Sequence, residues 1–216
     1  MGNAAGTYKK KAAIGSLIGF KSENPFECLF VKKERVCLRE TFQKLENPKE
    51  IVGAVFLKIL NDIAPELKKV FGVERSPRAV MLKMPKLSGH VAWFTDYLQQ
   101  LTTMLGYTEN LLGAWQLVRR TGRTHHRHSF LKANQDSDIN YFKLVGNVFI
   151  DELIPYLNGE KDESTQDTKK VRFASPYSTA TKSDVWQRFF NVLVSEMMRS
   201  FEQECQKNGI TIKPSY

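Results

Sequence analysis

Apolar side chains that recur every three or four residues are the feature that most constrains how this chain folds. The clearest run lies near the C-terminus and comprises Trp186, Phe189, Phe190, Leu193, Val194, Met197, Met198 and Phe201. This spacing puts all of them on one face of an α-helix, and a helix with one apolar face packs against a core. No stretch alternates apolar and polar residues as a half-buried strand does. The sequence therefore predicts an all-α fold.

The same period recurs in four further segments and, more weakly, between residues 34 and 45. These segments span residues 51–63, 87–101, 111–122 and 139–153. Asn47 and Pro48 form a typical helix start, and we expect that helix to end before Pro65. We also expect the 139–153 helix to break at Pro155. With short connections between them, about six to eight helices are expected.

The length of 216 residues suits one generous domain with tails. We assign the domain to residues 34–208. Residues 1–33 mix small residues, glycines and lysines, which predicts a flexible basic arm. Residues 158–182 are rich in Asp, Glu, Ser, Thr and Lys, so we expect a long surface loop before the last helix. Residues 209–216 are expected to form a C-terminal tail.

Net charge and cysteine content limit the expected partners and cellular location, but they do not identify the function. The 32 Lys and Arg against 23 Asp and Glu give a net charge of +9, which suits nucleic acid, anionic membranes or acidic proteins as partners. The cysteines Cys28, Cys37 and Cys205 are few, odd in number and widely spaced, which favours neither a disulfide framework nor a Cys-type zinc site. No apolar run reaches the roughly 18 residues that span a bilayer, and the start does not follow the secretory pattern. We expect a cytoplasmic protein.

The histidines lie in two places along the chain, and this distribution carries the functional signal. His90 follows Leu87 by three residues and precedes Phe94 by four, so its imidazole shares the apolar face of that helix. His125 follows the apolar stripe of the 111–122 segment at offsets that also keep it inward. Two inward imidazoles are compatible with core residues bonded to backbone carbonyls, and equally with two ligands of one haem iron.

Two further histidines, His126 and His128, lie close to His125, and neither is expected to be the iron ligand. His126 is turned by about 100° around the helix and is expected to face solvent. His128 lies on the side of His125 if the helix continues. A zinc site built from His90, His125 and His128 lacks a fourth ligand and any tight spacing.

Several motifs in one order resemble the globin family, over roughly residues 34–208. Pro65 precedes Phe71 by six residues, as in the family's turn after the second helix. His90 lies 19 residues beyond Phe71, close to the family's spacing to its distal histidine. The run Gly122–His125 is similar to the family's glycine, two variable residues and proximal histidine.

This resemblance implies a globin fold around a haem b, with His125 as the proximal iron ligand and His90 on the distal side. It further implies that Phe71 stacks on the porphyrin, that Phe94 narrows the ligand space and that Leu57 limits the distal pocket from above. The chain looks most like neuroglobin-like and nematode globins with extended termini. In that group the distal histidine often binds iron directly, which implies a bis-histidine, hexacoordinate haem.

A hexacoordinate globin is suited to redox or oxygen and nitric oxide sensing, or to electron transfer, because oxygen or another diatomic ligand must compete with the distal histidine. Whether it is an enzyme stays open, with nitrite or nitric oxide chemistry as the candidate activity. Oxygen transport or storage is the alternative within the same fold. A basic helical adaptor without haem is the alternative from another class. Dense basic groups occur only at Lys9–Lys11 and Arg119–Arg127, with no nucleic-acid-binding motif, so no nucleic-acid partner is expected.

The first residues, Met1 to Thr7, resemble an N-myristoylation signal in which Gly2 becomes the acylated terminus. The usual hydroxyl at the sixth position is replaced by Gly6, with Thr7 one place later. Lys9–Lys11 follow at once, and one acyl chain binds membranes stably only with a second signal such as a basic patch. We therefore expect reversible association with the cytoplasmic face of a membrane through Gly2 and these lysines.

Overall fold

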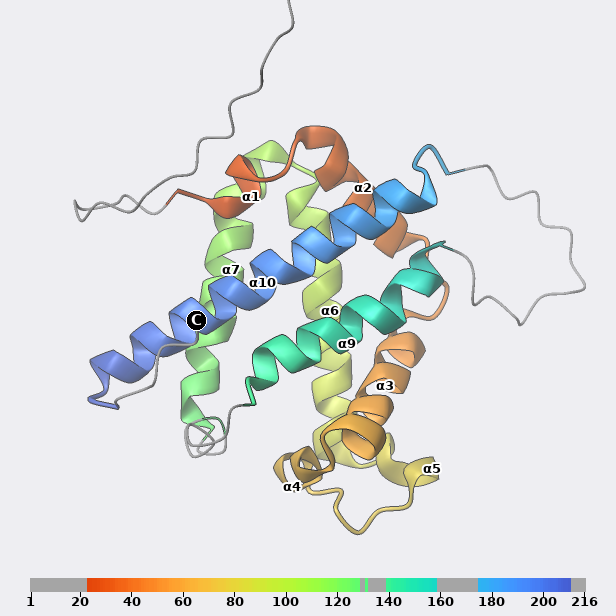
Figure 1. Cartoon of the computed structure of the whole chain (residues 1–216), viewed down its shortest axis with the longest axis vertical. Coiled ribbons are helices and arrows are strands. Elements are labelled where there is room, and N and C mark those ends of the chain that lie inside the picture. Colours follow the sequence, from red (N-terminus) through yellow and green to blue (C-terminus); the bar gives the residue numbers. More distant parts are fainter. Residues whose placement is uncertain (1–22, 129–130, 132–138, 159–174, 211–216) are drawn as a thin grey trace, which may run out of the picture.

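The structure, a computed structural model, describes residues 23–128, 131, 139–158 and 175–210 (Figure 1). All regular structure in these ranges is helical, which confirms the all-α prediction. The α-helices are α1 Pro25–Cys28, α2 Lys32–Gln43, α3 Pro48–Lys58, α4 Lys68–Phe71, α5 Arg78–Met81, α6 Pro85–Leu105, α7 Leu111–Thr124, α9 Tyr141–Asn158 and α10 Thr179–Lys207. A π-helical turn, Ile59–Ile63, extends α3, and short 3-10 turns lie at Pro65–Leu67, Thr108–Asn110 and His125–Arg127.

The long helices form two crossing layers around one core. Helices α9 and α10 lie side by side in front of α6 and α7 (Figure 1), and α10 packs on both α7 and α9. Helix α6 packs on α2 and α3, which close the other side of the core. Two glycines allow the closest approaches. A Cβ added at Gly122 of α7 would lie 2.8 Å from the Cα of Met197, and one at Gly146 of α9 would lie 2.5 Å from Val194 Cγ2.

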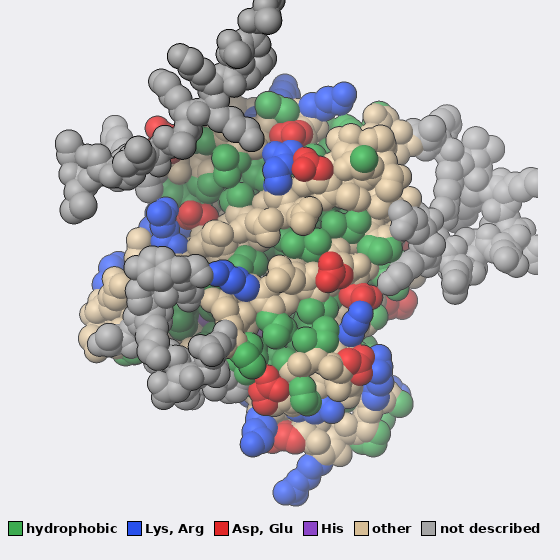
Figure 2. All heavy atoms as spheres, viewed as in Figure 1, with side chains coloured by type: hydrophobic (Ala, Val, Ile, Leu, Met, Phe, Trp, Pro, Cys, Tyr) green, Lys and Arg blue, Asp and Glu red, His purple; other side chains and the backbone are tan. Residues whose placement is uncertain are grey.

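Acidic and basic side chains alternate on the face that α9 and α10 present in Figure 2, rather than gathering by sign. Hydrophobic side chains occupy the strip between the two helices on this face. None of the described helices combines the length and the apolar composition that a bilayer crossing requires.

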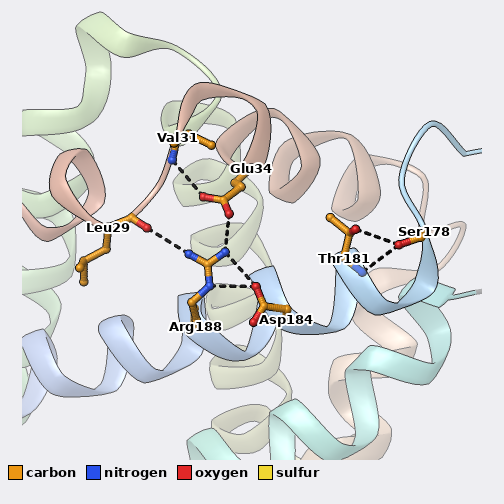
Figure 3. Close-up of polar contacts among 7 residues, drawn as sticks. All are labelled: Leu29, Val31, Glu34, Ser178, Thr181, Asp184 and Arg188. Atoms are coloured by element: carbon orange, nitrogen blue, oxygen red, sulfur yellow. Dashed lines mark hydrogen bonds and ion pairs between the residues drawn. The ribbon is translucent and has the colours of Figure 1, made fainter. Parts of the chain in front are cut away.

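Arg188 of α10 fastens the N-terminal part of the domain to the last helix (Figure 3). Its guanidinium donates to the carbonyl oxygen of Leu29 at 3.0 Å and pairs with the carboxylates of Glu34 at 2.5 Å and Asp184 at 2.9 Å. The same group lies over the ring of Phe30, 5.2 Å from its centroid. A planar guanidinium can satisfy several acceptors at once, so one side chain holds α1, α2 and α10 together.

The structure moves the start of the packed domain toward the N-terminus. Residues 23–33 were expected to belong to the flexible arm, but Phe26 and Phe30 are buried in the core. Their burial explains the difference, because two aromatic side chains removed from water stabilise even a four-residue helix such as α1. Short apolar patches in a glycine-rich and lysine-rich stretch do not reveal this from the sequence.

The expected break at Pro155 is wrong, since α9 continues through it to Asn158. Proline removes one backbone donor, but the last turn is held by other contacts. Leu153 and Leu157 are buried, and the Nζ of Lys182 donates to the carbonyl of Leu157 at 3.0 Å. Helix α10 likewise starts inside the segment expected to be loop, with Ser178 as its cap.

Candidate functional site

One apolar cavity of about 400 Å³ lies among α6, the end of α7, α9 and α10. Its remaining wall comes from α3, the π turn after it and α4. Four of the five residues predicted to form the pocket line this cavity: His90, His125, Phe71 and Phe94. The fold thus brings these four predicted residues together, although they are up to 54 positions apart in the chain, from Phe71 to His125.

His90 projects from α6 into an aromatic surround. Its ring centroid lies 5.2 Å from that of Phe56, nearly perpendicular to it, and 5.2 Å from that of Phe71. No hydrogen bond to the His90 ring occurs within the described ranges. Burial is the main cause that lowers the pKa of His90 to about 4, and the nearby His125 and His128 contribute because a second positive charge would be repelled. The imidazole is therefore neutral at pH 7 and has a nitrogen lone pair available.

His125 is the residue at which α7 tightens into a 3-10 turn. Its Nδ1 donates to the carbonyl oxygen of Thr121 at 2.8 Å, so the lone pair of Nε2 is left for a metal. Metal-binding histidines are generally oriented by such a bond from the other ring nitrogen. Burial lowers the pKa of His125, although the bond to Thr121 acts in the opposite direction. The ring of Phe142 packs edge-on against this imidazole, with centroids 5.4 Å apart.

The residues predicted to form the cavity wall, other than the histidines, do not all lie in it. Phe94 lies in the cavity wall against Phe149 of α9, with ring centroids 4.8 Å apart, and so narrows the space beside His90. Phe71, at the end of α4, forms the wall beyond Phe56. Leu57 is not among the lining residues. It is half-buried against the core, and its neighbour Phe56 occupies the wall from α3 in its place.

His126 and His128 differ in their position relative to the cavity. His126 Nδ1 donates to the carbonyl oxygen of Arg123 at 2.7 Å, and the residue does not line the cavity. His128 is exposed yet contributes to the cavity lining, with its ring centroid 6.0 Å from that of His125. Among the described residues, no three His, Cys, Asp or Glu side chains are placed to share a metal ion, which gives the zinc alternative no support.

Sequence reasoning missed several residues of this site, Phe56 among them. Lys86 and Trp93 line the cavity, and their positions four residues before and three after His90 place them on its face of α6. This helical spacing from His90 was a signal in the sequence that could have identified Lys86 and Trp93 as lining residues. Tyr141 at the start of α9 also lines the cavity, and its hydroxyl donates to a carboxylate oxygen of Glu66 at 2.8 Å. Nothing in the sequence connects these last two residues, which are 75 positions apart.

The cavity suits a flat, largely apolar metal macrocycle. Two neutral imidazoles reach into it from different helices, and aromatic and aliphatic side chains form most of the remaining wall. A porphyrin needs that combination, because its face is apolar while its iron takes imidazole as an axial ligand. Fold and site together define a helical haem-pocket protein.

No protein-family model matches this chain, and no curated protein sequence is similar to it at a significant level. Among solved structures, it is similar to "Globin-like protein Glb-12 from C.elegans", with 52% sequence identity and a TM-score of 0.78. The match covers 89% of this chain and 100% of the other. The chain therefore belongs to the globin family, as the motifs predicted. Membership of this family supports the binding of haem and of a diatomic gas as its ligand.

Proposed function

We propose that this globin holds haem b with His125 as the proximal ligand and His90 bound directly to the iron on the distal side. The observation that carries the proposal is that both imidazoles line one apolar cavity. They are also close enough for each other's charge to matter, since His125 contributes to the lowered pKa of His90. A neutral imidazole with no protein hydrogen bond is well prepared to bind a metal.

The protein's own residues hold both ligands in place. The Thr121 carbonyl fixes the ring orientation and the tautomer of His125. The rings of Phe56 and Phe71 flank His90 and exclude water from it. The bound iron supplies reversible ligand binding and a one-electron change of oxidation state. Because the protein supplies both axial nitrogens, that electron change needs little rearrangement.

This coordination favours redox signalling, oxygen or nitric oxide sensing, or electron transfer over bulk oxygen carriage. Oxygen must displace His90 before it binds, and Phe94 reduces the room beside that histidine. Oxygen transport or storage remains the second candidate, because the pocket accommodates a diatomic ligand once His90 swings away. Membership of the globin family argues against a haem-free adaptor.

The spectrum of the ferrous protein tests the coordination. We expect purified, reduced protein to show a low-spin spectrum without added ligand, and carbon monoxide to convert it slowly because it must displace an imidazole. His90→Leu should shift the ferrous protein to the five-coordinate, high-spin form. The matched control is His126→Leu, since His126 lies outside the cavity and is bonded to Arg123. A high-spin wild type, or a low-spin His90→Leu, contradicts the assignment.

The lifetime of the oxygen complex separates the two functional candidates. Rapid autoxidation, on exposure of the ferrous protein to air, supports a redox or sensing role. An oxygen complex that persists for hours supports carriage and contradicts the redox role.

Membrane association through an acylated Gly2 is a separate proposal about the N-terminus. Gly2 and Lys9–Lys11 lie outside the described residues, so its support is the sequence motif alone. Co-expression with an N-myristoyltransferase should add the myristoyl mass to the wild type and not to Gly2→Ala. Only the acylated protein should then sediment with vesicles that contain anionic lipid. An unmodified wild type contradicts the proposal without affecting the haem site.

A further inference from the structure

Among the described residues, Trp93 is the large aromatic side chain that both lines the haem cavity and is substantially exposed to solvent. It lines the cavity and is 45% exposed. A tryptophan buries a large apolar area when it is covered, so leaving it exposed forgoes stabilisation. Its position on α6, three residues after His90, puts the indole directly beside the proposed iron ligand.

The indole lies in a short aromatic stack that begins at His90. The ring centroids of His90 and Trp93 are 6.2 Å apart with planes inclined by 30°, and those of Trp93 and Tyr97 are 5.4 Å apart with planes inclined by 12°. Neighbouring aromatic rings at these separations form a short path from His90 toward the surface. An electron can therefore pass between the iron and the surface through His90 and Trp93 without crossing a gap of saturated side chains.

The other two tryptophans lack these properties. Trp115 donates its N–H to the carboxylate of Glu196 at 2.7 Å, and Arg119 lies over its ring at 5.0 Å, where the cation disfavours loss of an electron. Trp186 is fully buried and donates to Thr41 Oγ1 at 2.9 Å. Neither of them lines the cavity.

Tyr97 cannot easily take over the end of the stack. Its hydroxyl is buried and lies near Thr121 without forming a hydrogen bond in the described structure. Oxidation of a phenol releases its proton, and this buried hydroxyl does not contact solvent that could take the proton. Burial raises the pKa of Tyr97, which also keeps that proton in place. Trp93, by contrast, borders water that can accept its indole proton, so the stack ends functionally at Trp93.

We propose that Trp93 is the residue through which the haem iron exchanges single electrons with small molecules at the protein surface, with hydrogen peroxide as the oxidant. Reduction of one hydrogen peroxide to two waters takes two electrons and two protons. Haem held by His125 and His90 would supply one of these electrons. Trp93 supplies the second electron and releases its indole proton to the bordering water, and the solvent supplies both protons that the peroxide consumes.

The product of this step is a neutral tryptophanyl radical at the surface. An external thiol or other one-electron donor restores Trp93 by returning an electron and a proton. The inference depends on the proposed haem coordination, because His90 links the iron to the indole.

Spin trapping tests the location of the radical. Haem-loaded protein, verified by its Soret band, is reduced, freed of reductant without air and mixed with one equivalent of hydrogen peroxide and a nitroso spin trap. We expect mass spectrometry to map the adduct to Trp93. Trp93→Phe keeps a stacking ring but removes the oxidisable indole, so the adduct should be lost there. Apoprotein treated in the same way should carry none, which separates relay from mere exposure.

Tyr107→Phe is the matched control, because Tyr107 is also an aromatic residue with 45% exposure but does not line the cavity. This variant should keep the adduct at Trp93. An adduct on Tyr141 in the wild type, an unmodified Trp93, or an adduct of equal yield in the apoprotein overturns the relay while leaving the haem site intact. A protein without a Soret band after addition of hemin overturns the proposed function and the relay together.

Discussion

Gly122→Ala places one methyl group where α7 and α10 come closest, and the geometry sets its effect. The added Cβ would overlap the Met197 carbonyl oxygen and Ser200 Oγ, and would lie 2.8 Å from the Cα of Met197. Two of these atoms belong to the backbone of α10, so no side-chain rotation relieves the overlap. Carbon atoms pack best at about 3.5–4.0 Å, so the two helices must move apart by about 1 Å.

The cost follows from two opposing effects. Alanine favours a helix over glycine by about 1 kcal/mol, whereas overpacking a tight contact costs about 1–3 kcal/mol. Because the clash involves backbone, we expect the upper end of that range and a net loss of about 2 kcal/mol. His125 lies three residues beyond Gly122, so the displaced end of α7 should also hold haem less tightly.

Urea unfolding of the apoprotein and a hemin titration followed at the Soret band measure both effects. Gly89→Ala is the control, because nothing lies within 4 Å of a Cβ added there, and it should gain up to about 1 kcal/mol. Gly113→Ala is intermediate, since its Cβ would meet only the flexible end of Met104. A Gly122→Ala protein as stable as Gly89→Ala would refute the argument from close helix approach.

Three further predictions concern buried polar groups. Burial raises the pKa of Cys37 from its ordinary 9.0 to about 11, so the neutral thiol stabilises the fold below pH 9 and this effect is lost as the pH rises toward 11. The free energy of unfolding should therefore fall by up to about 3 kcal/mol across this range in the wild type, and this loss should be absent in Cys37→Ala. Lys182→Met keeps the apolar stem but removes the charged donor to the Leu157 carbonyl, so urea unfolding should show a loss of about 1.5–3 kcal/mol, and an unchanged midpoint would contradict that role. Trp115→Phe leaves the buried Glu196 carboxylate without its indole donor and should cost about 1.5–3 kcal/mol, whereas the same change combined with Glu196→Leu should cost less than the sum of the two single changes.

The sequence was sufficient for the class of fold and for the inward placement of two histidines. Helical periodicity reports which residues share a face, and that information is local to each segment. It placed His90 and His125 on inward faces, and the structure finds both in one cavity. Periodicity failed at the edges of the stripes. Leu112 falls within the apolar stripe of the 111–122 segment but is 57% exposed.

Only the tertiary structure decided which side chains form the cavity wall. Leu57 and Phe56 are adjacent in α3, and the rotation of that helix against α6 and α9 gives the wall to Phe56. Tyr141 bonds to Glu66, 75 positions away, and the exposure of Trp93 depends on how the other helices cover α6, neither of which a single segment encodes. A helical pattern depends on neighbours three and four residues away, whereas a pocket depends on how several helices cross. For that reason the sequence alone determined the helices and their inner faces, and the packing determined the site.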